Sequence, residues 1–259
     1  METIVVSGCS FTDKNFKSDI HSDLDTSYIK WPELIKFKGN IINVAQTGAD
    51  NVTLINNVFD EMHNNLHIDR VIVALSSWLR FSTPDAFFHP ATYKWYATYS
   101  EVREQQKSLS KIIKFMDHHK KYYDIYGGIH NNIMNRSIEK LIDSTLRHIW
   151  LLYNICKMKN IKLHIFQMLS PSQLNGKGKS FILLYEKFCH YLINHSLFSK
   201  IDKLKDVDLI GWPFEHDIGG NVCDYFLDKQ CRISDLDGHP NEKGHRIIAH
   251  WFDINAKDT

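Results

Sequence analysis

Short runs of β-branched and aliphatic residues alternate along the chain with segments whose apolar positions repeat every three or four residues. Three such runs occupy residues 3–6, 40–44 and 70–75, and polar or small residues follow each of them. This character is typical of buried strands that end in loops. The first third of the chain therefore predicts three strands.

Helical patterns fill the intervals between these strands. Residues 31–37 (WPELIKF) place Pro32 in the first turn of a predicted helix, and the apolar residues of 51–66 recur in steps of three and four. Later segments predict a long helix at 138–152, a strand at 161–169, a helix at 181–193, a strand at 207–210 and a last helix at 242–252. Such alternation predicts an α/β fold, with a parallel sheet, right-handed crossovers and helices on both faces.

One segment, at about residues 81–135, interrupts this alternation. It combines clusters of aromatic residues with polar, helix-like stretches and the sequence Tyr126-Gly127-Gly128. The chain shows no internal repeat and no long linker that would divide it. We therefore predict a single domain over residues 1–259 with a mostly helical insertion. The aromatic side chains of the insertion fit a wall for a sugar or acyl group, a dimer surface or a local core.

Composition and charge restrict the partners of the protein. Of 259 residues, 43% are hydrophobic, and 31 basic side chains stand against 30 acidic ones, which gives a net charge of +1. This balance provides no general attraction for nucleic acid or an anionic membrane.

Five cysteines without a CxxC pair favour a reducing compartment. No stretch reaches the roughly 20 apolar residues needed to cross a bilayer, and no basic segment precedes the first apolar run. We expect a cytoplasmic protein that binds neither nucleic acid nor membrane.

Candidate chemistry lies in the loops after the first strands, because ligands of parallel sheets bind at the carboxyl ends of the strands. The sequence Gly8-Cys9-Ser10-Phe11-Thr12 places a serine hydroxyl at this edge, near the expected start of a helix. A serine here is also typical of a helix cap or turn. After the second strand, Gly48 lets a backbone N–H approach a ligand closely, or forms a turn before a helix capped by Asp50 or Asn51.

The stretch from Ser234 to His245 is the most informative one. It contains Asp237-Gly238-His239-Pro240-Asn241 and leads into an apolar helix. Serine-dependent acyl transfer needs an imidazole that accepts the serine proton and a carboxylate that holds the imidazole tautomer. Taken alone, the same stretch also fits a capped turn with a solvated histidine.

Together these pieces resemble the SGNH (GDSL-like) hydrolase family. Members carry a Gly-x-Ser loop after the first strand, a glycine after the second, an asparagine after the third and an Asp-x-x-His or similar motif before the last helix. The corresponding residues here are Gly8-Cys9-Ser10-Phe11, the segment from Asn43 to Gly48, and Asp237-Gly238-His239-Pro240-Asn241 with Gly244. The resemblance implies a flavodoxin-like three-layer α/β/α sandwich with Ser10, His239 and Asp237 as catalytic residues.

The third strand departs from the family pattern. The usual Gly-x-Asn-Asp is replaced by Ala74-Leu75-Ser76-Ser77, so the asparagine that would donate to the oxyanion is missing. Loss of one such donor costs on the order of 10²- to 10³-fold in rate. Four residues are candidates to replace it: Ser76, Ser77, Asn51 and Arg80.

The spacing of the acid and the base also departs from the family. The aspartate precedes the histidine by two positions, at Asp237, where three is commonest, and position 236 is a leucine. The orienting carboxylate is therefore Asp237 or Asp235, and we favour Asp237.

These residues predict a serine esterase or deacylase acting on a small-molecule or glycan ester, including O-acetyl groups, with acyl transfer as a related activity. Ser10 attacks, His239 acts as base and then acid, and the amides of Ser10 and Gly48 receive the oxyanion. No cofactor is expected. A metal is not expected either, because His63 and His67 lack the glutamate of an HExxH motif between them. The alternative is an SGNH scaffold that has lost hydrolytic activity and serves as a glycan-binding or protein-interaction module.

Overall fold

The structure is a computed structural model that describes most of the chain. The described residues are 1–18, 21–65, 67–78, 81–83, 86–89, 94–96, 138–169, 188–211, 213–214, 229–234 and 237–257.

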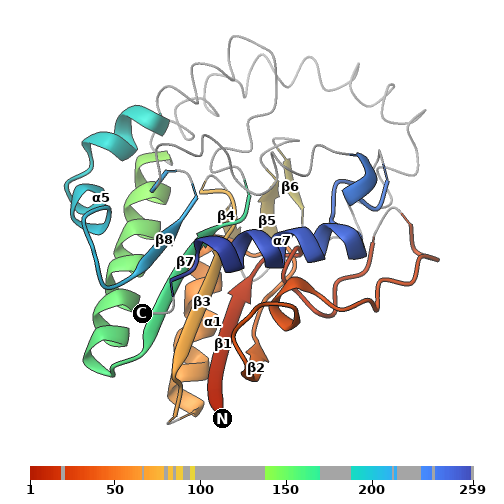
Figure 1. Ribbon diagram of the computed structural model, residues 1–259. Coiled ribbons are helices and arrows are strands. Elements are labelled where there is room, and N and C mark those ends of the chain that lie inside the picture. The colour runs from red at the N-terminus through yellow and green to blue at the C-terminus, as the bar shows by residue number, and fades with distance from the viewer. Residues whose placement is uncertain are drawn as a thin grey trace, which may run out of the picture.

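An all-parallel sheet of five strands lies at the centre of this described part (Figure 1). Its strands are β1 (Glu2–Gly8), β2 (Gly39–Asn43), β3 (Arg70–Leu75), β7 (Lys162–Gln167) and β8 (Asp208–Ile210). They lie in the order β2-β1-β3-β7-β8. Counted within this sheet alone, the order is the 2-1-3-4-5 arrangement of flavodoxin-like folds. The predicted α/β fold with a flavodoxin-like parallel sheet is confirmed.

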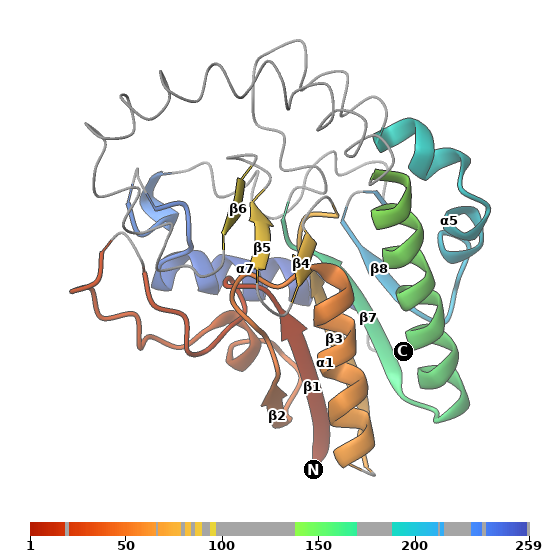
Figure 2. The same cartoon turned by 180° about the vertical axis from the view of Figure 1, so that it is seen from behind.

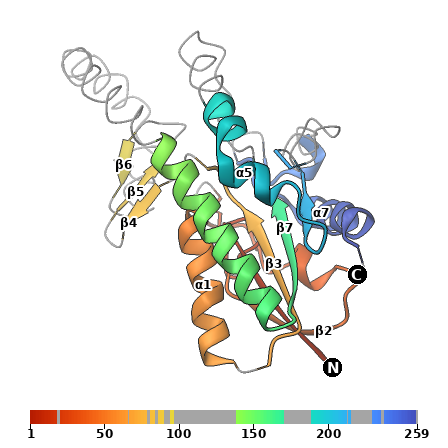
Figure 3. The ribbon, with the colours of Figure 1, turned by 90° about the vertical axis from the view of Figure 1, so that its left-hand side faces the viewer.

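Helices cover both faces of the sheet. One face carries α1 (Asn51–Asn64), the helices over residues 138–158 and 188–194, and α5 (Ser196–Ile201). Seen from behind, α1 and the helix over 138–158 run across this face (Figure 2). The opposite face carries the 3₁₀ turn η1 (Trp31–Glu33) and α7 (Glu242–Asn255). The side view shows the sheet between the two helical layers (Figure 3).

Alternating strand side chains build a separate apolar core on each face. In β1, Val5 faces the core beneath α1, whereas Ile4 and Val6 face the core beneath α7. β3 alternates in the same way, and all six of its residues are buried. This burial on both sides explains why the central strands are continuous apolar runs, as is typical of parallel sheets.

Residues 31–37 do not form the predicted helix. The structure has only the short 3₁₀ turn η1, with Pro32 in its first turn and Trp31 fully buried. The following residues are held by contacts outside the segment, because the backbone N–H of Lys36 donates to Asp253 Oδ1 at 2.8 Å. These tertiary contacts replace the i→i−4 bonds that would have continued a helix.

The described part of the insertion is β structure and not helix. Strands β4 (Phe81–Thr83), β5 (Ala86–His89) and β6 (Lys94–Tyr96) form a separate three-stranded antiparallel sheet. Aromatic residues favour strands and occur in all three of these. Most of the insertion lies outside the described residues, so its mostly helical character stays a prediction. Residues 97–135 of the predicted insertion lie outside the described residues.

The topology fixes where a ligand would bind. From β1 the chain first goes to β2 at one edge, and then crosses to β3 on the other side of β1. Loops leaving β1 and its neighbour β3 therefore diverge at the carboxyl ends of these strands, where parallel sheets bind ligands. Ser10 lies two residues beyond the end of β1.

Candidate active site

Ser10 lies in a tight turn immediately after β1. The backbone N–H groups of Thr12 and Asp13 both donate to the Cys9 carbonyl, at 2.8 and 3.0 Å. No helix begins here, contrary to the sequence-based expectation, so the turn itself fixes the position of the serine. Gly8 permits this close turn, because a Cβ atom at that position would lie 2.6 Å from the Cβ of Thr12. Ser10 is largely buried, with 7% of its surface exposed.

His239 lies in a loop that is fixed at both of its ends. Arg232 and Pro240 form a β-bridge, and the N–H of Ile233 donates to the His239 carbonyl at 2.9 Å. Asn241 follows as the N-cap of α7: its side-chain oxygen accepts from the N–H of Gly244 at 3.0 Å. The cap and the bridge together hold the histidine in front of the carboxyl edge of the sheet.

The structure brings Ser10, His239 and Asp237 into one hydrogen-bonded series. Ser10 Oγ lies 2.9 Å from His239 Nε2. His239 Nδ1 lies 2.6 Å from Asp237 Oδ1. Asp237 Oδ1 also accepts from the backbone N–H of His239, at 3.1 Å. This local turn, in which an aspartate bonds its own backbone two residues on, lets a two-residue spacing place the carboxylate against the ring.

The pKa of Asp237 indicates where the protons of this series lie. Burial opposes the charge of Asp237, but hydrogen bonds from His239 and Ser18 and the attraction to His239 outweigh it, and the pKa of Asp237 is lowered to about 2. The carboxylate is thus ionised near neutral pH and only accepts hydrogen bonds. It follows that Nδ1 of His239 carries a proton, which leaves Nε2 as the ring nitrogen that faces the Ser10 hydroxyl.

Two phenyl rings pack against the imidazole of His239. The Phe16 ring is stacked on it, with centroids 4.2 Å apart, and the Phe11 ring is tilted against it at 5.1 Å. These contacts leave the His239 side chain 30% exposed, compared with 3% for Asp237. The ring is held by apolar surfaces and still has access to a ligand.

The loop after β2 is hydrogen-bonded to the turn that carries Ser10. Gly48 adopts a φ of +84°, a left-handed conformation that glycine adopts at little cost. Asp13 Oδ2 accepts from both the N–H and the hydroxyl of Thr47, at 3.1 and 2.8 Å. The N–H of Gln46 donates to the Gly8 carbonyl at 2.9 Å. The residue before Gly48 is therefore fixed relative to the turn that carries Ser10.

Two of the candidate oxyanion residues meet at the carboxyl end of β3. The N–H of Ser76 donates to Asn51 Oδ1 at 2.8 Å, and both residues are buried. Among the described residues, Asn51 Nδ2 and Ser76 Oγ are buried polar atoms with no hydrogen-bond partner. Buried polar groups are normally paired, so an unpaired amide donor at this edge needs an explanation. Ser77, the third candidate, follows Ser76 and is also buried. Arg80, the fourth candidate, and Asp235, the alternative orienting carboxylate, lie outside the described residues.

Two residues of this site were not predicted from the sequence. Ser18 donates to Asp237 Oδ2 at 2.5 Å, and Phe16 is stacked on His239. Both belong to the stretch between Ser10 and η1, which has no strand or helix periodicity. No motif in the sequence marks them.

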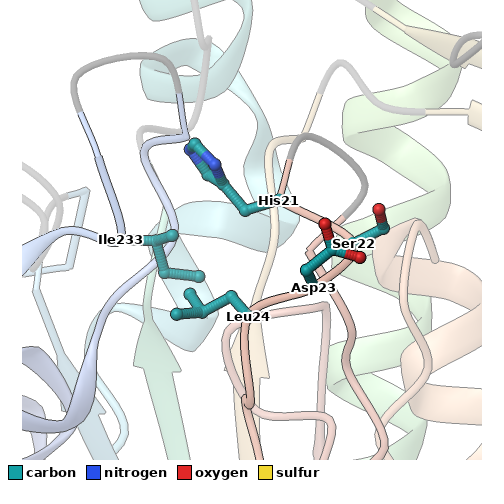
Figure 4. Close-up of a pocket in the computed structure, with 5 residues that line it drawn as sticks. All are labelled: His21, Ser22, Asp23, Leu24 and Ile233. Carbon is teal, nitrogen blue, oxygen red and sulfur yellow. The ribbon is translucent and has the colours of Figure 1, made fainter.

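A cavity of about 410 Å³ lies beside the Asp237 end of the series. Figure 4 shows Leu24 and Ile233 facing each other, with the ring of His21 above them. The lining residues are His21, Ser22, Asp23, Leu24 and Ile233. His21 Nε2 lies 2.7 Å from Ser234 Oγ, which also accepts from the N–H of Asp237 at 3.0 Å. One wall of the cavity is thus hydrogen-bonded to the turn that contains Asp237.

The described residues provide neither a metal-binding cluster nor a membrane-spanning helix. They contain no group of three or more histidine, cysteine, aspartate or glutamate side chains placed to hold a metal ion. In the same ranges, every helix is too short or too polar to cross a membrane.

Comparison with known proteins gives a likeness in structure only. No protein-family model and no curated protein matches the sequence. Among solved structures, the chain is similar to the psychrotrophic esterase EstA from Pseudoalteromonas sp., in a structure inhibited by monoethylphosphonate. The alignment covers 98% of this chain and 96% of that one, with 9% identity and a TM-score of 0.48. Identity and TM-score at this level are too low to transfer residue roles.

Proposed function

We propose that this protein is a serine ester hydrolase of the SGNH type, with Ser10 as nucleophile, His239 as general base and acid, and Asp237 as the orienting carboxylate. Esters of small molecules or glycans, O-acetyl groups among them, are the proposed substrates. The observation that carries the proposal is the continuous series Ser10 Oγ, His239 Nε2, His239 Nδ1 and Asp237 Oδ1, with contacts of 2.9 and 2.6 Å.

The first half of the reaction forms an acyl-enzyme. Ser10 Oγ bonds to the ester carbonyl carbon while its proton passes to His239 Nε2. Asp237, ionised and buried, stabilises the imidazolium that results. The tetrahedral intermediate then collapses: the bond to the alkoxy oxygen breaks, and His239 returns the proton to the departing alcohol.

The second half releases the acid. Water attacks the acyl carbon and gives a proton to His239 Nε2, and the Ser10 ester bond then breaks with return of that proton to Oγ. An alcohol in place of water would give acyl transfer by the same steps. Product analysis with and without added alcohol acceptors distinguishes the two activities.

The proposed oxyanion hole comprises the backbone N–H groups of Ser10 and Gly48 and the side-chain amide of Asn51. Asn51 supplies the donor that the third strand lacks. Its Oδ1 is held by the N–H of Ser76, which leaves Nδ2, a donor without a partner among the described residues, for the substrate oxygen. This assignment gives the buried, unpaired amide a function.

A labelling experiment tests the nucleophile. Wild-type protein treated with a fluorophosphonate is expected to gain one adduct, located at Ser10 by mass spectrometry, because only an activated serine reacts readily. The Ser10→Ala and His239→Ala variants should stay unlabelled, whereas the exposed serine variant Ser22→Ala should label like wild type. Absence of both labelling and turnover on a broad panel of esters would favour the scaffold that has lost hydrolytic activity and has a binding role.

A second set of variants tests the oxyanion donor. Asn51→Asp keeps an oxygen for the Ser76 N–H but removes the Nδ2 donor, and we expect kcat to fall about 10²- to 10³-fold. Ser76→Ala removes only the unpaired hydroxyl and should leave kcat near the wild-type value. A larger loss in Ser76→Ala than in Asn51→Asp would move the donor role from Asn51 to Ser76.

A further inference from the structure

The carboxylate of Asp237 is held from the side opposite to His239 by a serine far away in the sequence. Ser18 Oγ donates to Asp237 Oδ2 at 2.5 Å, across 219 positions of the chain. Ser18 is buried, with 1% of its surface exposed. Its oxygen in turn accepts from the N–H of His21 at 2.9 Å. The hydroxyl therefore has one donor and one acceptor contact, which fix its direction.

The two carboxylate oxygens of Asp237 thus have different hydrogen-bond partners. Oδ1 accepts from the ring and the backbone of His239, whereas Oδ2 accepts from Ser18. Rotation of the carboxylate about its Cβ–Cγ bond would break both sets of contacts at once. Ser18 consequently opposes the rotation that would take Oδ1 away from Nδ1, and it stabilises the ionised form of the acid.

We propose that Ser18 is a positioning residue for the reaction, the fourth member of the series Ser10–His239–Asp237–Ser18. The inference rests on the proposed function, and it adds a residue that acts through Asp237 without contacting the substrate. A second contact supports the position of the acid: His21 Nε2 lies 2.7 Å from Ser234 Oγ, which accepts from the N–H of Asp237.

The primary experiment compares Ser18→Ala with Ser27→Ala. Ser27 is exposed and does not line the cavity, so its variant controls for loss of a serine hydroxyl in this part of the chain. We expect Ser18→Ala to lower kcat on a small acetyl ester by about 10- to 100-fold, as is usual for loss of a hydrogen bond to a charged group. KM should change little, because Ser18 does not contact substrate. Ser18→Thr, which keeps the hydroxyl, should recover most of the rate.

A double-mutant cycle separates positioning from general structural damage. In an Asp237→Asn background the carboxylate through which Ser18 acts is gone, so adding Ser18→Ala should cause no further loss. Multiplying losses in the two backgrounds would overturn the proposal.

A spectroscopic measurement decides the proposal independently of turnover. The Nδ1 proton of His239 can be followed by NMR in ¹⁵N-labelled protein, with His239→Gln identifying the signal. We expect its exchange with solvent to accelerate in Ser18→Ala and to return to the wild-type rate in Ser18→Thr. An Nδ1 signal unchanged by Ser18→Ala would refute the role of Ser18. If wild-type protein neither labels nor turns over esters, the proposed function fails, and this signal alone then decides whether Ser18 holds Asp237.

Discussion

Histidine–aspartate pairs occur at both ends of the parallel sheet, and their surroundings differ. At the carboxyl ends of the strands, His239 Nδ1 lies 2.6 Å from Asp237. At the amino ends, His164 of β7 lies 2.8 Å from Asp208 of β8. The pairs are similar in contact length and in residue type. What differs is the group that faces the other ring nitrogen.

In the pair at the amino ends, that group is a cation. Arg70 Nη1 lies 2.6 Å from His164 Nε2, and Arg70 Nε donates to Glu2 Oε1 at 2.9 Å. Burial lowers the pKa of His164, and the charge of Arg70 lowers it further, against the raising effect of Asp208. A neutral ring that accepts from a guanidinium has no free lone pair for a substrate proton. The pair at the amino ends therefore cross-links β3, β7 and β8.

In the pair at the carboxyl ends, the group at Nε2 is the Ser10 hydroxyl, which can give up its proton. The proposed catalytic role of His239 therefore depends on the partner of its second ring nitrogen and on its access to solvent, as well as on the contact with Asp237. His239 is 30% exposed at its side chain, whereas His164 is 3% exposed.

The matched variants Asp237→Asn and Asp208→Asn should give the largest contrast. Asp237→Asn is expected to lower kcat by about 10⁴-fold, because the amide no longer holds the productive tautomer of His239. Asp208→Asn should leave kcat near the wild-type value and lower the midpoint of thermal unfolding instead. Steady-state rates on a small ester and thermal melts of both variants measure the contrast. Equal effects of the two variants on kcat would remove the distinction between the pairs.

Replacement of Arg70 should have the next largest effect, on stability. Arg70→Met leaves Glu2 without its cation and His164 without its donor, and we expect a loss of about 3–5 kcal/mol in the free energy of unfolding. Its effect on kcat should be small, because the site lies at the other end of the strands. Urea unfolding measures the loss.

Arg147→Met is the control for this variant. Arg147 pairs with Asp143 at 2.7 Å, but its side chain is 70% exposed. Exposed pairs contribute about 0–1 kcal/mol. If both arginine variants lost the same stability, burial of the Arg70 network would not be the source of its effect.

Strand periodicity made the sheet predictable, but not the loops. The runs at 3–6 and 70–75 match β1 and β3 because burial on both faces requires continuous apolar sequence. The run at 40–44 matches β2, an edge strand whose residues are only partly buried or exposed. The prediction at 31–37 was wrong because tertiary contacts ended the helix after one turn. The local sequence pattern reflects helix propensity but not tertiary contacts.

The candidate site was predictable where chemistry needs a particular residue type beside a strand or helix end. Ser10 follows β1, and His239 precedes α7, so element boundaries indicated both. Ser18 had no such marker, because its partner Asp237 lies 219 residues away. Only the fold brings the two residues together.

Acid should destabilise both ends of the sheet through histidines with lowered pKa. His245 is buried in α7, and burial, followed by the charge of Lys30, lowers its pKa to about 3. As the pH falls, this histidine is protonated near pH 6.5 in the unfolded chain but only near pH 3 in the folded protein. The free energy of unfolding therefore falls as the pH drops from about 6.5 towards 3. The slope is about 1.4 kcal/mol per pH unit for each such histidine. His164, whose pKa is also lowered, adds to it from the opposite end.

Urea unfolding at pH values from 7 to 5 measures this slope. His245→Gln and His164→Gln should each flatten the dependence of the unfolding free energy on pH. His67→Gln is the control, because that side chain is 83% exposed and should leave the slope unchanged. A slope that survives both buried variants would have to come from other groups.

The smallest expected effect concerns the link between the two loops at the carboxyl end. Asp13 Oδ2 holds Thr47 through two hydrogen bonds, next to the proposed oxyanion donor Gly48. Asp13→Ala should let this loop move relative to Ser10 and lower kcat by about 10-fold, because a displaced donor loses part of its contact with the oxyanion. Thr47→Val, which removes only the hydroxyl contact, should have a smaller effect in the same direction. Stability should change little, since the link joins loops and not strands.

Rates of ester turnover and of fluorophosphonate labelling measure both variants, with the exposed Asp23→Ala as control. A large loss of stability in Asp13→Ala would instead show that the loops at this end support the fold in the way that the buried network does at the other.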